Sequence, residues 1–295
     1  MHCQKRKGDA PLRFDAGLVA ANTGVMTSAP SSVPKRRSTL KRIVLWALAL
    51  FGVALLAIAL VFVASFAGLP PVQDGEELGD VGVVVKDGYT SLDILRAGNG
   101  QVALIDAGAD VKGEALLAAL KKQGLTADSV RAIFLTHGHP DHTAGCHLFP
   151  RAEVYALAED VALAEGRGKA HGPVTQFIPA KDTGVRVTHA LRDGDVVPVG
   201  TLNVHVYAVP GHTAGSAAYQ VRNVLFVGDS ADATKDGKLT SAKWVVSDDA
   251  TQNRRSLVTL ADRLVPEKTV ELVVASHTGT LKGLGVLEAL GAKLK

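Results

Sequence analysis

The 295-residue sequence contains only two cysteines, Cys3 and Cys146, which lie far apart in the chain. Two isolated cysteines cannot form the disulfide framework that stabilises small secreted domains. Cys146 follows a histidine-rich run, but we expect it to be a small buried residue on a short helix rather than a metal ligand. The scarcity of cysteine therefore leaves the redox compartment undefined.

A net positive charge is also absent beyond the first 42 residues. Nine Lys/Arg and two acidic residues precede Ile43, so the net charge of +3 averages a basic tail and a mildly acidic remainder. An acidic folded part lacks the basic surface that nucleic-acid binding requires, and we expect no nucleic-acid partner. The hydrophobic content of 47% nevertheless predicts a packed core.

Residues 43–66 lack charge altogether. At a rise of about 1.5 Å per residue, this run is long enough to cross a hydrocarbon core about 30 Å thick. A basic cluster comes directly before it (Lys35, Arg36, Arg37, Lys41 and Arg42). The positive-inside rule then predicts a single-pass membrane protein with a cytoplasmic N-terminus and a periplasmic or extracellular catalytic domain.

Cleavage and secretion are the second choice for this segment. Ser65-Phe66-Ala67 fits a signal-peptidase site, but the apolar run is longer than a usual signal peptide, so we favour an uncleaved signal anchor. Translation from Met26 instead of Met1 stays open. The expected domains are a disordered, basic cytoplasmic tail (1–42), a transmembrane anchor (43–67), a linker (68–79) and a catalytic domain (80–295).

From Val81 onward, apolar runs alternate with amphipathic segments, which is typical of an α/β domain. Asp87-Gly88 predicts a hairpin between the runs 81–86 and 90–95. Further strands are expected at 101–105, 130–135, 185–189, 202–209, 217–221, 224–227 and 270–275, with helices at 110–122, 252–264 and 284–294. In the first helix we expect Leu116, Leu117 and Leu120 to share one face, with Asp110 as its cap.

Polar residues recur where these predicted strands end. Asp106, His137, Asp229 and His277 each follow a short apolar run directly, and His212 follows one at slightly greater distance. Strand ends present side chains at one rim of a sheet. We therefore expect these five residues to converge.

Residues 137–142 read His-Gly-His-Pro-Asp-His. Imidazole nitrogens and a carboxylate this close together suit zinc, and also iron or manganese. The glycine permits a close backbone turn and the proline stiffens it. The run predicts a metal site rather than a solvated histidine-rich loop.

This run resembles the HxHxDH signature of the metallo-β-lactamase superfamily. The other parts match in order: Asp106 in Ile-Asp-Ala-Gly, His212 in Pro-Gly-His-Thr-Ala-Gly-Ser, Asp229 in Gly-Asp-Ser and His277 in Ser-His-Thr-Gly. The resemblance covers roughly residues 80–280. It implies an αβ/βα four-layer sandwich, with two mixed sheets face to face and helices outside.

The resemblance also implies the roles of the residues. His137, His139 and His212 would hold one metal, Asp141, His142 and His277 the second, and Asp229 would bridge both. Asp106 resembles the family's carboxylate that orients the ligand loop without binding metal. The implied cofactor is two Zn²⁺ ions, although iron or manganese would also suit the site. Such a pair can generate a bridging hydroxide that attacks a carbonyl carbon, and we hypothesise that Asp141 takes or relays a proton as the catalytic residue.

The expected function is therefore a binuclear zinc hydrolase that cleaves a small-molecule ester, thioester or lactone. Glyoxalase II-like enzymes share the bridging Asp, but this chain ends 18 residues after His277, without their helical region for glutathione. True metallo-β-lactamases usually lack that Asp, which makes β-lactams a second choice. A mononuclear iron persulfide dioxygenase-like oxidoreductase and a non-catalytic membrane-tethered scaffold are two further hypotheses. The oligomeric state stays open.

The remaining histidines and tyrosines are weaker candidates for the site. We expect His189 and His205 to be strand residues and His147 to lie on a helix surface. His171 lies in a loop that could cover the site. Tyr89, Tyr207 and Tyr219 are unranked candidates for oxyanion donors, and the loops 166–182 and 231–250 are expected to set substrate specificity.

Overall fold

The computed structural model describes residues 37–180 and 182–295. Residues 1–36 of the expected basic tail (1–42), with Cys3 and the alternative start Met26, lie outside these described residues, whereas residues 37–42 belong to the first helix. The chain divides into two units, 1–55 and 56–295. The boundary falls within the first helix.

Helix α1 (Arg37–Phe66) contains the charge-free run and begins before it. Its portion Thr39–Phe66 is long and apolar enough to cross a membrane, by length and composition. The helix ends where Gly68 adopts a φ of 82° and two prolines follow, because proline cannot continue the helical hydrogen bonds.

The first sheet contains six strands in chain order. These are β1 (Gly82–Asp87), β2 (Thr90–Gly98), β3 (Gln101–Ile105), β4 (Val130–Phe134), β5 (Glu153–Leu157) and β6 (His189–Leu191). The predicted hairpin is confirmed, since β1 and β2 pair antiparallel around Asp87-Gly88. Strands β3 to β6 run parallel to one another. Helix α2 (Glu114–Lys122) connects β3 with β4.

The second sheet has the order β14-β13-β10-β9-β8-β7. Its strands are β7 (Val196–Val199), β8 (Leu202–Ala208), β9 (Ala217–Val221), β10 (Val224–Gly228), β13 (Leu272–Ala275) and β14 (Gly279–Lys282). Strands β11 (Ala231–Ala233) and β12 (Leu239–Ser241) form a separate two-stranded sheet. Helices α5 (Ala250–Leu264) and α6 (Gly285–Leu294) complete this half. The remaining helices are short: α3 (Pro140–Thr143), α4 (Val161–Ala164) and 3₁₀ turns at 127–129, 146–148, 158–160, 175–177 and 244–246.

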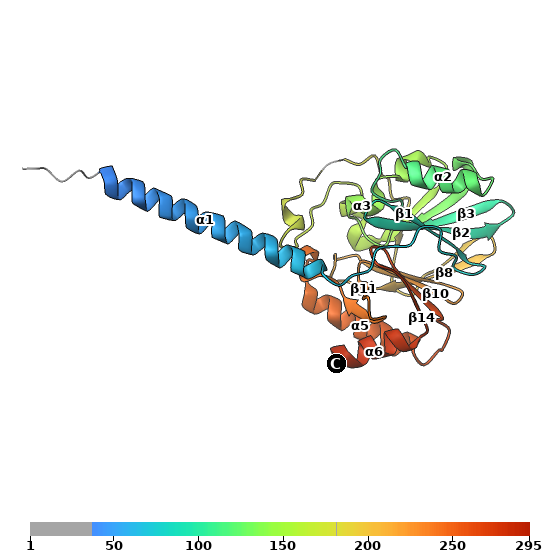
Figure 1. The fold of residues 1–295 in the computed structure, drawn as a ribbon. Helices are drawn as coiled ribbons and strands as arrows, with labels where there is room; N and C mark the ends of the chain where they lie inside the picture. Colours follow the sequence, from blue (N-terminus) through green and yellow to red (C-terminus); the bar gives the residue numbers. More distant parts are fainter. Residues whose placement is uncertain (1–36, 181) are drawn as a thin grey trace, which may run out of the picture. The chain divides into compact units, whose positions relative to one another are not determined.

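Three hydrophobic clusters define four layers. One cluster fills the space between the two sheets and includes Phe134, Tyr219 and Phe226. A second joins the outer face of the first sheet to α2, and a third joins the outer face of the second sheet to α5 and α6. Figure 1 shows the two sheets face to face with helices outside both. The expected αβ/βα sandwich is confirmed.

Several predicted boundaries were wrong. Helix α2 begins at Glu114, because Asp110 caps it from a preceding turn by accepting hydrogen bonds from the Lys112 and Glu114 amides, and Leu117 is partly exposed. The strand predicted at 185–189 lies instead at His189–Leu191. Residues 68–79 do not form a free linker, because Val72 and Leu78 are buried in the cluster between the sheets.

Phe134 tests the cluster between the sheets. Its ring is fully buried and stacks on Tyr155 at a centroid distance of 4.7 Å. Phe134→Ala should lower the free energy of unfolding by about 3–5 kcal/mol, since it removes apolar contacts and leaves a cavity. Urea denaturation of the full chain in non-ionic detergent measures this change.

Phe177→Ala provides the matched control, because the Phe177 side chain is 79% exposed. We expect its effect to stay within about 0.5 kcal/mol. Equal losses for the two variants would contradict the assignment of Phe134 to the core.

Candidate metal centre

Five strands deliver the predicted site residues to one edge of the sandwich. Asp106 and His137 follow β3 and β4, which are parallel neighbours. Asp229 and His277 follow the parallel strands β10 and β13. His212 follows β8, which runs in the same direction as β10 because both pair antiparallel with β9. The predicted convergence of these strand ends is confirmed.

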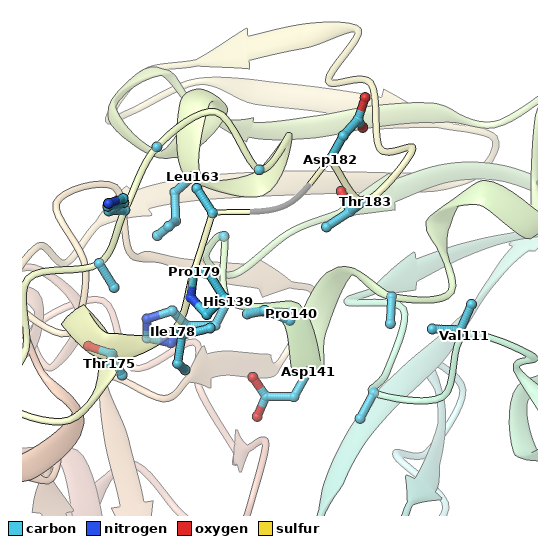
Figure 2. Close-up of a pocket in the computed structure, with 18 of the residues that line it drawn as sticks. Val111, His139, Pro140, Asp141, Leu163, Thr175, Ile178, Pro179, Asp182 and Thr183 are labelled. Atoms are coloured by element: carbon cyan, nitrogen blue, oxygen red, sulfur yellow. The ribbon is translucent and has the colours of Figure 1, made fainter.

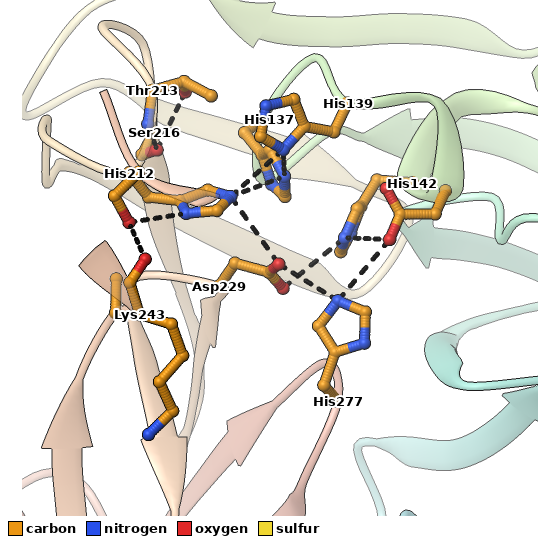
Figure 3. Close-up of polar contacts among 12 residues, drawn as sticks. His137, His139, His142, His212, Thr213, Ser216, Asp229, Lys243 and His277 are labelled. Atoms are coloured by element: carbon orange, nitrogen blue, oxygen red, sulfur yellow. Dashed lines mark hydrogen bonds and ion pairs between the residues drawn. The ribbon is translucent and has the colours of Figure 1, made fainter. Parts of the chain in front are cut away.

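The first group of side chains consists of three buried imidazoles. The Nε2 atom of His137 lies 3.0 Å from Nδ1 of His139, and Nε2 of His212 lies 3.2 and 3.1 Å from these two atoms. Burial lowers the pKa of His137 well below its usual range and that of His212 to about 3. Neutral rings carry nitrogen lone pairs, so this group can present three donors to one cation (Figure 3).

The second group contains Asp141, His142 and His277. The Nε2 atom of His277 lies 3.5 Å from Asp141 Oδ2, and Nε2 of His142 lies 3.7 Å from the same oxygen. Asp229 lies between the two groups. Its Oδ2 is 3.0 Å from His277 and 3.6 Å from His212, and its Oδ1 is 3.4 Å from His142.

Charge distinguishes the two groups. Burial favours the neutral form of His277, but Asp229 outweighs it and raises the pKa of His277 to about 9. Burial is likewise outweighed at His142, where Asp229 and Asp106 raise the pKa well above its usual range. A cation bound beside Asp229 would replace these protons, because both occupy the same lone pairs.

Hydrogen bonds at the other ring nitrogen fix the orientation of His137 and His142. Asp106 Oδ2 accepts from the Thr136 hydroxyl at 2.7 Å, which leaves that hydroxyl oxygen to accept from His137 Nδ1 at 3.1 Å. The same Asp106 oxygen accepts from His142 Nδ1 at 2.7 Å. Both rings therefore hold their proton on Nδ1 and direct Nε2 towards Asp229 or the imidazole group.

His212 and His277 are fixed in the same way. The Ser247 hydroxyl donates to the Lys243 carbonyl at 2.8 Å, so its oxygen is free to accept from His212 Nδ1 at 3.2 Å. His277 Nδ1 donates to the Tyr89 carbonyl at 2.9 Å. These partners again leave Nε2 as the ring atom that faces the candidate site.

The sequence did not predict the residues that fix the loops carrying the candidate histidines. Buried Asp160 accepts hydrogen bonds at 2.7 Å from the Gly138 amide, the Gly215 amide and the Thr213 hydroxyl, and so joins two ligand loops. Thr136 and Ser247 were also missed. The contacts from Asp160 to Gly138, from Thr136 to Asp106 and from Ser247 to His212 join residues 22, 30 and 35 positions apart, so no local sequence pattern identifies them. Gly138 needs the absence of a side chain, because a Cβ there would lie 2.6 Å from the Ala164 amide nitrogen.

The donor set fits a metal pair. The ligand-capable atoms of three trios lie within 4.8 Å of one another: His137, His139 and His212; His137, His142 and Asp229; Asp141, His142 and His277. Among the described residues, buried His142 Nε2 and Asp229 Oδ1 have no hydrogen-bond partner, which a bound cation would supply. Nitrogen and carboxylate donors in this number suit zinc.

The other candidates have ordinary structural roles. Cys146 is buried in a hydrophobic cluster and burial raises its thiol pKa far above the usual range, as expected for a packing residue. His189 and His205 are exposed strand residues, and His147 is exposed on a 3₁₀ turn. His171 is exposed as well, and its amide donates to Asp248.

Among the three tyrosines, only Tyr89 lines a cavity at the site. Tyr219 donates its hydroxyl to the Leu135 carbonyl in the core, and Tyr207 donates to Gln220. Two adjoining cavities of about 490 and 470 Å³ open beside Asp141, and both are also lined by Tyr89 and Ile178. Figure 2 shows the first of them. This size suits a small-molecule ligand.

Comparisons with known proteins agree with this geometry. The metallo-β-lactamase superfamily model matches residues 89–277. A hydroxyacylglutathione hydrolase of Nitrosomonas eutropha is 34% identical over 152 residues, covering 51% of this chain and 48% of that protein. The human metallo-β-lactamase domain-containing protein 1 is 30% identical over 174 residues, covering 55% of this chain and 56% of its own length. The chain spans about half the length of these curated relatives.

Solved structures share the fold at low identity. A B3 metallo-β-lactamase with an active-site glutamic acid has a TM-score of 0.59 at 17% identity, covering 79% of this chain and 91% of that one. A metallo-β-lactamase family protein of Thermus thermophilus has a TM-score of 0.52 at 24% identity, covering 72% and 78%. The fold and site thus define a metal-dependent hydrolase class. The chain belongs to the metallo-β-lactamase superfamily.

Asp106→Asn tests the orientation of the imidazoles. The asparagine side chain has the same size and also tolerates the left-handed backbone at this position, where φ is 58°. Loss of the charge weakens the hydrogen bonds to Thr136 and His142, so zinc affinity should fall about 10–100-fold. Competition with a chromogenic chelator measures the dissociation constants.

His189→Ala serves as the control, because His189 is exposed and distant in the chain from every predicted ligand. Its zinc affinity should equal that of the parent protein. Unchanged affinity in Asp106→Asn would show that Asp106 does not orient the ligands.

Proposed function

We propose that the protein is a binuclear zinc hydrolase that cleaves an ester, a thioester or a lactone. The position of Asp229 supports this proposal most strongly. Its two carboxylate oxygens face His142, His212 and His277, so one side chain contacts both groups of donors. A carboxylate shared in this way favours a pair of metals over a single ion.

The proposed ligands follow the two groups. His137, His139 and His212 would hold the first zinc, Asp141, His142 and His277 would hold the second, and Asp229 would contribute to both. When bound, such a pair supplies an acidified water as nucleophile and a Lewis acid for a carbonyl oxygen. Asp106 holds His142 and, through Thr136, His137 in the orientation that this binding requires.

Two of the chain's own side chains then have separate roles, Asp141 towards the water and Tyr89 towards the substrate. Asp141 directs Oδ2 towards His142 and His277, which leaves Oδ1 to take a proton from the attacking water. Partial burial, reinforced by Asp141 and Asp229, raises the pKa of Tyr89 to about 12. Its hydroxyl therefore stays protonated at neutral pH and can donate to the oxyanion of the tetrahedral intermediate.

The two groups of relatives differ in how strongly they support a substrate class. The hydroxyacylglutathione hydrolases share up to 34% identity over half of the chain, which favours a thioester or a related acyl compound. The B3 metallo-β-lactamases share the fold at identities near 17%, so their likeness does not extend to β-lactams. A single-iron persulfide dioxygenase remains the second candidate, because two histidines and one aspartate of the same site are sufficient for it.

Metal content and turnover test the proposal together. The purified full chain should contain about two zinc ions and hydrolyse at least one of phenyl butyrate, S-phenyl thiobutyrate and γ-butyrolactone. One iron per chain with oxygen uptake on glutathione persulfide would assign the dioxygenase instead. Turnover of a chromogenic cephalosporin alone would assign a β-lactamase.

The proposed bridging role of Asp229 can be tested by substitution. Asp229→Ala should reduce zinc content to about one ion and lower kcat/KM at least about 100-fold, because both metals lose a ligand. His189→Ala should change neither. Equal effects of the two substitutions on zinc content and kcat/KM would refute the ligand assignment.

We further propose that α1 is an uncleaved signal anchor. The domain order is then a cytoplasmic tail (1–42), a transmembrane anchor (43–67) and the catalytic part that follows it. The basic cluster before the charge-free run supports a cytoplasmic N-terminus. A cleaved, secreted form is the alternative.

A reporter fused after Lys295 tests the orientation. Alkaline phosphatase, which is active only outside the cytoplasm, should be active in this fusion and should sediment with membranes. Phosphatase activity in the soluble extracellular or periplasmic fraction would indicate cleavage. Inactive phosphatase, together with fluorescence of a cytoplasmic reporter at the same position, would overturn the orientation.

A further inference from the structure

The entrance to the candidate metal centre is apolar and exposed. Ile178 and Val174 line the cavity beside the predicted ligands and are 46% and 41% exposed, and the adjacent Phe177 is 79% exposed. On another segment, Trp244 is 53% exposed and lies next to Lys243, which lines the same cavity. Large apolar side chains gathered at an opening mark a binding surface.

These two segments are held side by side. The Val174 amide donates to the Val245 carbonyl at 3.0 Å, which fixes the Phe177 turn relative to the Trp244 turn. Tyr89 and Val111, which are 68% and 61% exposed, line the cavities from the first sheet's side. Figure 2 shows Val111 and Ile178 on opposite sides of Asp141 in that view. We call the set Leu69, Tyr89, Val111, Val174, Phe177, Ile178 and Trp244 the apolar rim.

The chain itself brings this rim close to the end of the charge-free run. Leu69 lines the cavity of the predicted ligands, and the Gly68 carbonyl accepts a hydrogen bond from the Lys235 amide at 3.2 Å. Phe66, the last residue of α1, precedes Leu69 by three positions. Even a fully extended chain covers only about 10 Å over that length.

The distance from Phe66 to Leu69 is comparable to the thickness of the lipid headgroup region. A bilayer of about 40–45 Å with a hydrocarbon core of about 30 Å leaves roughly 5–8 Å of headgroup region on each side. If α1 ends at the hydrocarbon boundary, Leu69 must lie within or just above the headgroups. This position of Leu69 follows from the length of the three-residue connection alone. It does not depend on the direction of α1.

We propose that the apolar rim docks into the lipid surface next to α1, and that the site takes its substrate from the bilayer. Tryptophan and phenylalanine favour this depth, because their rings combine apolar area with tolerance of the interface. The substrate is then an ester, thioester or lactone with an acyl chain, whose tail lies along Val174, Ile178 and Leu69 while its carbonyl reaches the ligands. The substrate half of this proposal rests on the proposed function, and the docking half does not.

Fluorescence tests the docking half without turnover. Trp46 lies in α1, so Trp46→Phe leaves Trp244 as the single tryptophan. In phosphatidylcholine vesicles, brominated acyl chains should quench the emission of Trp244 strongly, and the emission should be blue-shifted relative to urea-unfolded protein. Emission that is equal in brominated and unbrominated vesicles would overturn the docking.

Chain-length dependence tests the substrate half. With S-phenyl thioesters of butanoic to decanoic acid, kcat/KM should rise about three- to fourfold per added methylene until the cavity is filled. Val174→Ser, which removes apolar surface from the cavity wall, should reduce the ratio of decanoyl to butanoyl kcat/KM. Val196→Ser is the matched control, because Val196 is 49% exposed on β7 outside the rim, and it should leave that ratio unchanged.

The possible failures are distinguishable. Equal kcat/KM for all chain lengths in protein whose Trp244 is quenched would overturn the acyl substrate but leave the docking in place. Zinc-loaded protein that hydrolyses none of the esters, thioesters or lactones would refute the proposed function. The quenching result would still decide whether the rim enters the lipid.

Discussion

The candidate metal centre depends on one constraint: imidazole rings must present a lone pair at a fixed place, and each ring has two nitrogens. Four of the histidines meet this constraint by donating Nδ1–H to an oxygen, from Thr136, Asp106, Ser247 or the Tyr89 backbone. Their Nε2 atoms then face the site. Without these oxygens the rings could rotate or change tautomer, and the same sequence of histidines would be a poor ligand set.

The same constraint explains why the site needs the sandwich. The oxygens that orient the rings come from strand ends and loops of both sheets, so the sheets must be fixed relative to each other. Hydrogen bonds cross between them near the site, from the Tyr219 hydroxyl to the Leu135 carbonyl at 2.7 Å and from the Ala217 amide to the Thr136 carbonyl at 2.8 Å. The apolar cluster between the sheets offsets the cost of burying so many polar groups beside it.

Sequence alone predicts that the candidate residues converge, because strand ends are local features. The runs before Asp106, His137, Asp229 and His277 are apolar and short, and the structure brings their ends together as expected. Asp160 and Ser247 could not be predicted in this way. Their hydrogen-bond partners lie 22 to 55 and 35 residues away in the chain, so their roles exist only after folding. The helix start at Glu114 was missed for a local reason, since Asp110 caps from a preceding turn instead of the adjacent position.

The strand ends and the entrance to the site have different roles: the strand ends govern the reaction and the entrance governs the choice of substrate. Residues at or just after the strand ends form the candidate donor groups, and these groups determine which reaction the site can support. The entrance is formed by Leu69 and by segments around Phe177 and Trp244, all outside the strands. Likeness to a hydroxyacylglutathione hydrolase or a B3 β-lactamase therefore constrains the chemistry more than the substrate. In this chain the entrance begins three residues after α1 ends, so the proposed membrane anchor would be joined directly to the proposed specificity surface. Any change in the length of that connection would alter both at once.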